Sequence, residues 1–525
     1  MLRTDLIASI PELLARHAQC RPERIAFIDD KRSITYGELA QTTERLAGHL
    51  QDLGVDVGDR VLLYLDNCVE VAESYLAVPR SGAIAVCVNP QGTSAELEYL
   101  LADSGARVVI TDRTHLAGVR ELIGVQDGAL AVIVVDDEGE IDSAAAVSEV
   151  AYSTLLQSPA SAPRDPDSLD ATAWMLYTSG TTGRPKGVYL TQRGCLWVVA
   201  ACWAPIVGLG PDDVMLSPLP LFHSYALNLC VLAVTAVGAS VRILPKFSVT
   251  DAVQRLTGGK EGDITVFPGV PTMFHYMLDR RRDEGLRAPS LRLCISAGAV
   301  LTASLNEAFE EGFGVPLLDG YGTTETSTMI TMNWPTGNRF SGSCGIPLPG
   351  LTIRLIDPAT GRDVPLDHEG EIWVQGPNVT PGYHNLPDAS AAVLVEGWYR
   401  TGDLARRNQY GHLTISGRIK ELIIRGGENI YPAEVEDALV AVDEIEDAAV
   451  VGVPHEYLGE VPVAFVVAAE GRFLEHNDVL KRVGDRIAHF KVPERLIEVE
   501  AIPRTGSGKI LRFHLQQQLA ETRSE

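Results

Sequence analysis

The chain has few basic side chains for its length. Its 525 residues include 44 Lys and Arg against 69 Asp and Glu, which gives a formal net charge of −25 at pH 7. A field of that sign repels polyanions, so non-specific nucleic-acid binding is excluded as a default function. A small polyanion would have to be held locally, by a few cations and backbone N–H groups that overcome the global charge at one site.

Long apolar runs and paired cysteines are also lacking. The longest apolar run, residues 229–239, is well short of the roughly 20 residues that span a bilayer, and the N-terminus shows no secretory-signal pattern. The cysteines include no CxxC pair, so neither a zinc site nor a disulfide framework is predicted. We expect buried free thiols and a cytoplasmic protein; the cysteines are Cys20, Cys68, Cys87, Cys195, Cys202, Cys230, Cys294 and Cys344.

The length and pattern predict an α/β protein of at least two domains, because single cores stop growing near 250 to 300 residues. Short β-branched runs alternate with helix-like stretches, which is typical of a largely parallel sheet covered by helices. We predict strands at 60–65, 83–88, 107–111, 131–135, 240–244, 264–267 and 291–296, with helices at 43–53 and 95–103.

The sequence pattern that predicts secondary structure changes twice towards the C-terminus. From Gly345, closely spaced Pro and Gly punctuate short alternating runs such as 352–356 and 371–374, which indicates an antiparallel, barrel-like unit. After Gly417 a small α+β unit is predicted, with helices at 433–442 and 477–489 and strands at 447–453 and 461–468.

Residues 177–188, Tyr-Thr-Ser-Gly-Thr-Thr-Gly-Arg-Pro-Lys-Gly-Val, have the properties of a triphosphate cradle. Glycines let backbone N–H groups converge on an anion, hydroxyls add donors, and Lys186 adds a point charge. A Walker A loop is excluded by spacing: Pro185 and Lys186 stand where that motif needs Gly and Lys, and Gly187 replaces its Ser or Thr.

Four further segments carry suitable chemistry. Residues 319–325, Asp-Gly-Tyr-Gly-Thr-Thr-Glu, offer an aromatic ring for adenine, a hydroxyl for phosphate and a carboxylate for Mg²⁺. The others are 398–404 (Trp-Tyr-Arg-Thr-Gly-Asp-Leu), 417–432 and 503–510 (Pro-Arg-Thr-Gly-Ser-Gly-Lys-Ile). Alone, Lys420 would be a solvated charge and Lys509 a surface lysine.

Together these motifs resemble those of the adenylate-forming superfamily, which contains acyl-CoA synthetases, non-ribosomal adenylation domains and firefly-type luciferases. The resemblance runs from residues 36–39 to Lys509. It implies a large N-terminal AMP-binding domain, 1–419, of two covered mixed or parallel sheets plus a distorted β-barrel at about 345–416. It also implies a small mobile α+β lid, 420–525, with its hinge at Lys420.

The resemblance also assigns roles. Tyr321 covers adenine, Asp403 accepts ribose hydroxyls, and Lys509 bridges the substrate carboxylate and the α-phosphate. Implied catalytic residues are Lys509, Thr324, Glu325 and His223, with Glu325 as the Mg²⁺ ligand. Implied nucleotide, phosphate, hinge or thiol-channel residues are Thr178, Ser179, Gly180, Thr181, Thr182, Gly183, Lys186, Ala299, Asp319, Gly320, Tyr321, Gly322, Thr323, Asp403, Arg418, Lys420, Gly426 and Gly427.

The implied reaction is ATP-dependent activation of a carboxylic acid as acyl-AMP, followed by transfer to coenzyme A, with ATP, Mg²⁺ and CoA as cofactors. Positioning and charge neutralisation carry such a displacement at phosphorus, so no protein nucleophile is needed. Three alternatives stay open: loading of a carrier-protein phosphopantetheine, luciferase-like oxygenation, and a non-catalytic nucleotide-binding module.

The acid is left open among fatty, aryl and polycyclic classes, and a homodimer is expected from the resemblance. The predicted acyl-pocket residues are His223, Tyr225, Val270, Ala299, Gly320, Thr323 and Ser327.

Overall fold

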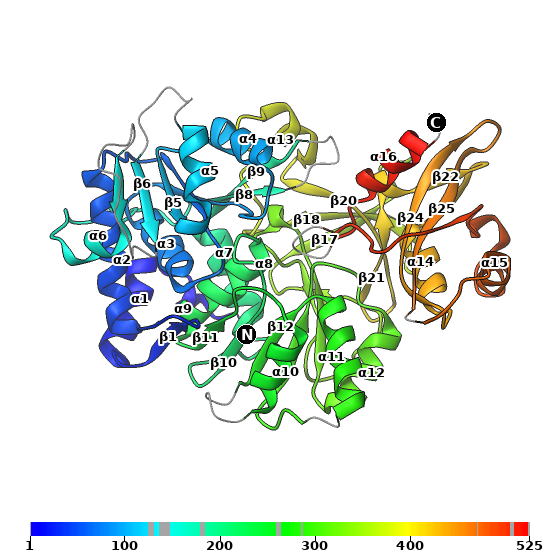
Figure 1. The fold of residues 1–525 in the computed structure, drawn as a ribbon, viewed down its shortest axis with the longest axis horizontal. Helices are drawn as coiled ribbons and strands as arrows, with labels where there is room; N and C mark the ends of the chain where they lie inside the picture. The colour runs from blue at the N-terminus through cyan, green and yellow to red at the C-terminus, as the bar shows by residue number, and fades with distance from the viewer. Residues whose placement is uncertain are drawn as a thin grey trace.

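The computed structural model describes residues 2–123, 131–135, 148–178, 184–258, 264–284, 287–469, 471–504 and 509–522. The chain before Arg418 forms three sheets, and the chain after it forms a fourth, at the right of the molecule in Figure 1. The α/β multidomain prediction is confirmed. Within the described residues no helix is both long and apolar enough to cross a membrane.

The first large sheet has nine strands in the order β16-β15-β14-β13-β12-β10-β11-β1-β2. Its middle pairings, from β14 to β1, are parallel, and the short strands at both ends are antiparallel. The strands are β1 (Ile25–Ile28), β2 (Ser33–Thr35), β10 (Val214–Ser217), β11 (Ser240–Ile243), β12 (Val266–Gly269), β13 (Leu293–Ser296), β14 (Leu317–Tyr321), β15 (Thr331–Met332) and β16 (Ile346–Pro347).

The second large sheet has seven strands in the order β7-β6-β5-β3-β4-β8-β9. Every pairing is parallel except that between β8 and β9. The strands are β3 (Arg60–Tyr64), β4 (Ile84–Cys87), β5 (Val108–Asp112), β6 (Ala131–Val135), β7 (Glu149–Ala151), β8 (Thr172–Thr178) and β9 (Lys186–Thr191). The predicted strands of both sheets are confirmed within a few residues.

The two sheets and their helices stack in layers around a shared core. Along β3, Val61 and Leu63 point into a core that also contains Val241 and Ile295 of the nine-stranded sheet, whereas Leu62 points into a separate core on the opposite face. This follows from the period-2 alternation of side chains on a strand. Both sheets are therefore covered on both faces, as parallel sheets require.

Helices fill each layer (Figure 1). The central layer includes α2 (Tyr36–Asp52), α3 (Val69–Arg80), α7 (Gln192–Val198), η2 (Val199–Trp203), α8 (Ser224–Ala226), η3 (Leu227–Ala233) and α9 (Val234–Val237). The outer layers include α4 (Ser94–Ser104), α5 (Arg113–Ile123), α10 (Val249–Thr257), α11 (Pro271–Glu284) and α12 (Ala303–Phe313). The remaining helices of this part are η1 (Thr4–Leu6), α1 (Ile10–Cys20), α6 (Tyr152–Gln157), η4 (Thr324–Thr326) and α13 (Pro387–Val393).

The segment expected to be barrel-like forms a five-stranded antiparallel sheet. Its strands are β17 (Thr352–Ile356), β18 (Glu369–Gln375), β19 (Leu394–Val395), β20 (Trp398–Arg407) and β21 (Leu413–Arg418). One face packs against Ile330 and Cys344 from the end of the nine-stranded sheet region, so this sheet is fixed to the nine-stranded one.

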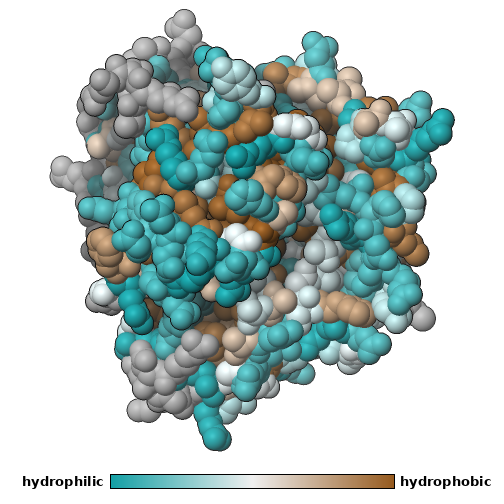
Figure 2. Space-filling view, turned by 90° about the vertical axis from the view of Figure 1, so that its right-hand side faces the viewer, coloured by the Kyte–Doolittle hydropathy of each residue, from teal (hydrophilic) through white to brown (hydrophobic). Residues whose placement is uncertain are grey.

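The C-terminal sheet has the order β23-β22-β25-β24, and β26 pairs with β25. Its elements are η5 (Ile419–Glu421), β22 (Ile423–Arg425), β23 (Glu428–Ile430), α14 (Pro432–Val440), β24 (Ile445–His455), β25 (Gly459–Ala468), α15 (His476–Gly484), η6 (His489–Lys491), β26 (Leu496–Glu498) and α16 (Arg512–Thr522). The helix predicted to reach His489 ends at Gly484, and the N–H of Asp485 closes its last turn by donating to the carbonyl of Lys481. Figure 2 shows this side of the molecule with polar side chains over much of its surface and apolar residues between them.

The cysteines are all free, as predicted. Six of the eight are buried. The expectation of burial is wrong for Cys20, which is exposed at the end of α1, and only partly right for Cys68.

Candidate active site

The predicted phosphate loop joins two neighbouring antiparallel strands. Thr178 is the last residue of β8, Lys186 is the first of β9, and the two residues pair across the hairpin. Both ends of the loop are therefore fixed at the carboxyl edge of β8. Five predicted residues, Ser179, Gly180, Thr181, Thr182 and Gly183, lie outside the described residues.

Lys186 and Glu325 both contact Tyr383, the first through its ring and the second through its hydroxyl. The Nζ of Lys186 lies 5.4 Å from the ring centroid of Tyr383, and the hydroxyl of Tyr383 donates to Glu325 Oε1 over 2.9 Å. The backbone carbonyl of Glu325 also accepts the N–H of Thr380 over 2.7 Å. Tyr383 was not predicted from the sequence, and it brings a cation and a carboxylate from distant motifs to one place.

A second group joins three predicted motifs. The hydroxyl of Tyr321, at the end of β14, donates to Asp403 Oδ2 over 2.6 Å, and Arg418 Nε lies 2.8 Å from Asp403 Oδ1. Asp403 is buried on β20, whereas the Arg418 side chain is 41% exposed, so the ion pair joins a buried carboxylate to a partly solvent-exposed guanidinium. Burial, followed by the negative charge of Asp403, raises the pKa of Tyr321, which stays neutral.

Gly320 and Gly322 are required by packing within the chain. A Cβ on Gly322 would lie 1.7 Å from the carbonyl oxygen of Thr328, and one on Gly320 would lie 2.4 Å from the methyl of Met329. The first contact is with backbone, which cannot move aside. Any larger residue at position 322 would therefore displace the segment that follows the motif.

His223 begins the short helix α8 beside the same motif. The next residue, Ser224, places its hydroxyl 3.4 Å from that of the buried Thr324. The ring Nδ1 of His223 accepts the N–H of Tyr225 over 3.2 Å, so in the neutral ring the proton is on Nε2. Burial, and secondly the positive charge of Lys509, lowers the pKa of His223 to about 3.

A narrow and mostly apolar pocket lies beside His223. Three predicted pocket residues, His223, Tyr225 and Val270, line it. Ala299 is exposed next to the pocket residue Gly298, whereas Gly320, Thr323 and Ser327 do not line it. The other residues that line the pocket are Leu219, Pro220, Ala226, Met273 and Gly298.

Lys509 lies in the electrostatic field of this site, although it belongs to the C-terminal part. Burial lowers its pKa, and the positive charge of Arg418 lowers it further, while Asp403, Glu325 and Glu421 act in the opposite direction. The positive charge of Lys509 also acts on His223, so the two side chains lie within electrostatic range of each other. The structure thus brings Lys509 together with residues of four other motifs.

Four predicted residues are not brought to this group: Gly426, Gly427, Lys420 and Asp319. Gly426 and Gly427 form the exposed turn between β22 and β23, where the N–H of Gly426 donates to the carbonyl of Leu458, in the turn between β24 and β25. Lys420 lies in the 3-10 turn η5 that links β21 to the C-terminal sheet. Asp319 is buried on β14, and burial raises its pKa well above its usual range.

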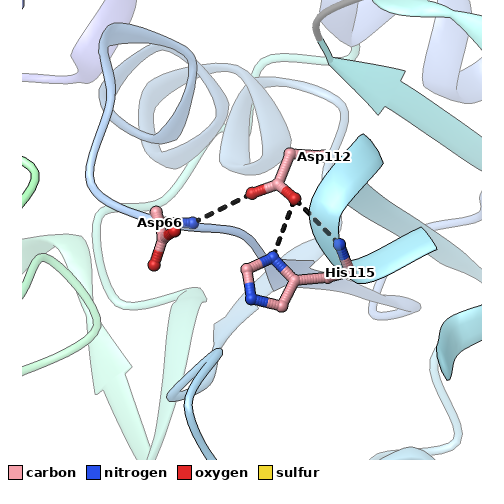
Figure 3. A group of neighbouring side chains, drawn as sticks. All are labelled: Asp66, Asp112 and His115. Atoms are coloured by element: carbon pink, nitrogen blue, oxygen red, sulfur yellow. Dashed lines mark hydrogen bonds and ion pairs between the residues drawn. The ribbon is translucent and has the colours of Figure 1, made fainter. Parts of the chain in front are cut away.

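Elsewhere in the described part of the chain, one group of side chains has ligand atoms close enough to share a metal ion: Asp66, Asp112 and His115 (Figure 3). Asp112 Oδ1 accepts the main-chain N–H of His115 over 3.0 Å and lies 2.7 Å from its ring Nδ1. Asp112 Oδ2 accepts the N–H of Asp66 over 3.3 Å. These bonds cap the first turn of α5 and fix the turn after β3, so we attribute the group to local structure.

Comparison with known proteins agrees with this geometry. The AMP-binding enzyme family model matches residues 14–384, and the AMP-binding enzyme C-terminal domain matches residues 434–509. The chain therefore belongs to the AMP-binding enzyme family, the adenylate-forming proteins that the motifs resemble.

Individual relatives are similar over almost the whole chain. It is 35% identical to the indoleacetate–CoA ligase of Aromatoleum aromaticum, covering 97% of this chain and 98% of the relative. An anthranilate CoA ligase structure in complex with anthranoyl-AMP has 25% identity and a TM-score of 0.90, covering 100% of both chains. The naringenin synthase of Pestalotiopsis fici is 35% identical over 96% of this chain, but the chain spans only 19% of that relative's length.

Proposed function

We propose that the protein is an ATP-dependent acid–thiol ligase that converts an aryl or arylalkanoic acid to acyl-AMP and then to its CoA thioester. The observation that carries the proposal is the meeting of Lys509 and Arg418 with Asp403, Glu325 and the neutral His223 beside an apolar pocket. Similarity to CoA ligases for indoleacetate and anthranilate supports the acid class.

The residues fit a nucleotide. One oxygen of Asp403 accepts from Tyr321 and the other pairs with Arg418; because a carboxylate has about four lone-pair sites, it can accept ribose hydroxyls as well. The hydroxyl of Tyr321 is held by Asp403, which fixes the ring that would cover adenine. Lys186 and the flanking hairpin would hold the phosphates at the carboxyl edge of β8.

The residues also fit Mg²⁺, a hard cation that prefers oxygen ligands. Glu325 would hold the ion, with the hydroxyl of Thr324 beside it, and the hydrogen bond from Tyr383 orients the carboxylate. When bound, the ion would neutralise phosphate charge during displacement at phosphorus.

In the first half-reaction the substrate carboxylate attacks the α-phosphate, so two anions must approach each other. Lys509 supplies the positive charge between them, and His223, neutral at physiological pH, donates from Nε2 towards the carboxylate. Lys186 and Arg418 neutralise the remaining phosphate charge. No proton has to leave a protein nucleophile, because the attacking oxygen belongs to the substrate.

In the second half-reaction a thiol attacks the acyl-AMP carbonyl and AMP leaves. We propose that the chain divides at Lys420 into a large domain, 1–419, and a lid, 420–525, and that the lid rotates about this residue. Rotation would withdraw Lys509 and bring Gly426 and Gly427 to the thiol path. Their present exposure, away from the pocket, is the arrangement that this proposal requires before rotation.

Acid-dependent exchange of labelled pyrophosphate into ATP tests the first half. We expect exchange with arylacetic, benzoic or cinnamic acids and little with long-chain fatty acids. Absence of exchange with every carboxylic acid would overturn the proposal and favour a non-catalytic nucleotide-binding module. Measuring thioester formation with free CoA, and separately with a phosphopantetheinylated carrier protein, distinguishes the two acceptors.

Cytoplasmic location and a homodimer remain predictions. Light scattering of the purified protein tests the second.

A further inference from the structure

A single carboxamide joins the seven-stranded sheet to the loop that carries the acid pocket. Asn67 follows β3 and precedes α3, two residues before the helix begins at Val69. Its side-chain nitrogen donates to the carbonyl oxygens of Leu219 over 2.8 Å and Leu244 over 3.1 Å, and its oxygen accepts the N–H of Leu221 over 2.8 Å.

These three bonds use the carboxamide fully and specifically. Both amide hydrogens donate and the oxygen accepts, so the side chain can be neither flipped nor replaced by an isosteric carboxylate without losing bonds. An aspartate would place a negative charge beside two carbonyl oxygens. The bonded groups lie in the loops after β10 and β11, two adjacent parallel strands of the nine-stranded sheet.

The loop after β10 forms one wall of the candidate acid pocket. Leu219, Pro220 and His223 all line the pocket. Leu221 lies between them, and its carbonyl accepts the hydroxyl of Tyr75, from α3, over 2.8 Å. Both backbone polar groups of Leu221 are thus held by side chains that belong to the β3–α3 unit.

The turn that carries Asn67 is itself fixed. The N–H of the preceding Asp66 donates to Asp112 Oδ2, and Asp112 also caps α5 through His115 (Figure 3). On the other side, the N–H of Val69 donates to Asp29 Oδ2 over 2.9 Å. Asn67 therefore projects from a turn that is anchored at both ends, which is what a residue that positions another loop needs.

We infer that Asn67 is a positioning residue for the acid pocket, holding the loop of Leu219, Pro220 and His223 at the distance that the acid requires. The inference rests on the proposed function for its catalytic readout, and on the three hydrogen bonds for its structural one. It does not involve the nucleotide residues, so its loss should affect the acid and spare ATP.

The test compares Asn67→Ala and Asn67→Asp with Asp66→Asn, a matched isosteric change at the neighbouring exposed position. In pyrophosphate exchange we expect both Asn67 variants to raise the KM for the acid about tenfold, with the KM for ATP within about twofold, because two or three buried backbone partners lose their bonds. Asp66→Asn should resemble the wild type. A residue that only fills space would tolerate Asp, which has nearly the same size.

Amide hydrogen exchange of the peptide spanning residues 219–225 gives a readout that needs no activity. We expect exchange about tenfold faster in the Asn67 variants than in the wild type and Asp66→Asn. Equal exchange in all four proteins would overturn the inference, even where no acid is accepted and the proposed function itself fails. If both Asn67 variants fail to fold, Tyr75→Phe removes one bond to the same loop and should raise the acid KM about threefold; an unchanged KM and unchanged exchange would overturn the inference.

Discussion

The two parts of the protein contribute to the candidate site in different ways. In the large part, Tyr321 and Asp403 lie on strands and Thr324 begins the 3-10 turn η4; all three are buried or half-buried, and their partners lie within a few ångströms. The C-terminal part contributes Lys509, and this part is joined to β18 by the hydrogen bond between the Tyr431 hydroxyl and Glu369. We infer that the nucleotide-binding residues are fixed in the large part. Lys509, the cation that acyl-AMP formation needs, belongs to the C-terminal part, which we propose rotates away between the half-reactions.

Lys509→Ala should have the largest effect. We expect acyl-AMP formation to fall by roughly a thousandfold, because the variant lacks the charge that neutralises two approaching anions. Thioester formation from supplied acyl-AMP should stay within about threefold of the wild type. Lys481→Ala, at an exposed position of α15, is the control; equal losses in both half-reactions would contradict a separate role for the C-terminal part.

Asp403→Asn tests the nucleotide-binding residues of the large part. The amide can still accept from Tyr321 but loses the ion pair with Arg418 and one acceptor for ribose. We expect the KM for ATP to rise by about 30-fold, with the acid KM changed much less. Isothermal titration with ATP alone measures the same loss without turnover. An acid KM that rises as much as that for ATP would show that the two halves are not separable.

The pH dependence should differ between the half-reactions. The folded-state pKa of Lys509 is lowered from its usual value, so its protonated form, which acyl-AMP formation needs, is lost as pH rises through that lowered pKa. Above it, kcat/KM for acyl-AMP formation should fall about tenfold per pH unit, and thioester formation from supplied acyl-AMP should lack this limb. Lys509→Arg should move the limb upwards; a limb that stays in place would assign it to another group.

Tyr431→Phe should have the smallest effect. It removes the hydrogen bond to Glu369 and keeps the ring, which packs against Gly417. Acyl-AMP formation should slow by about two- to fivefold, because the docked arrangement loses one bond of roughly 0.5–1.5 kcal/mol. Thioester formation should be equal or faster. Slowing of both half-reactions to the same extent would mean that this contact supports the fold and does not select an arrangement.

Much of the fold could be predicted from local pattern. The strands of both large sheets follow β-branched runs bounded by turn residues, and these runs were found within a few residues. The predicted helix at 43–53 overlaps α2, but the central helices at 192–203 and 224–237 were missed. Nearly all of their residues are buried because both sheets surround them, so no 3.6-residue periodicity marks them. The apolar run 229–239 is the clearest case.

The candidate site was predicted through motifs, and residues outside motifs were missed. Tyr383 contacts Lys186, almost 200 positions earlier in the sequence, and Glu325, 58 positions earlier, and Met273 reaches the pocket from α11. Neither has a local signal, since each becomes relevant only when distant segments meet. Asn67 was missed for the same reason.

The packing of Gly322 bears on how catalytic activity is inferred from the sequences of related proteins. A side chain at this position collides with backbone whether or not the chain binds a nucleotide. A relative without catalytic activity would still need glycine at this position in order to fold, whereas the fold does not require Lys509. The glycine at position 322 therefore indicates that a relative has this fold, and a lysine at position 509 is the better indicator that it catalyses the reaction.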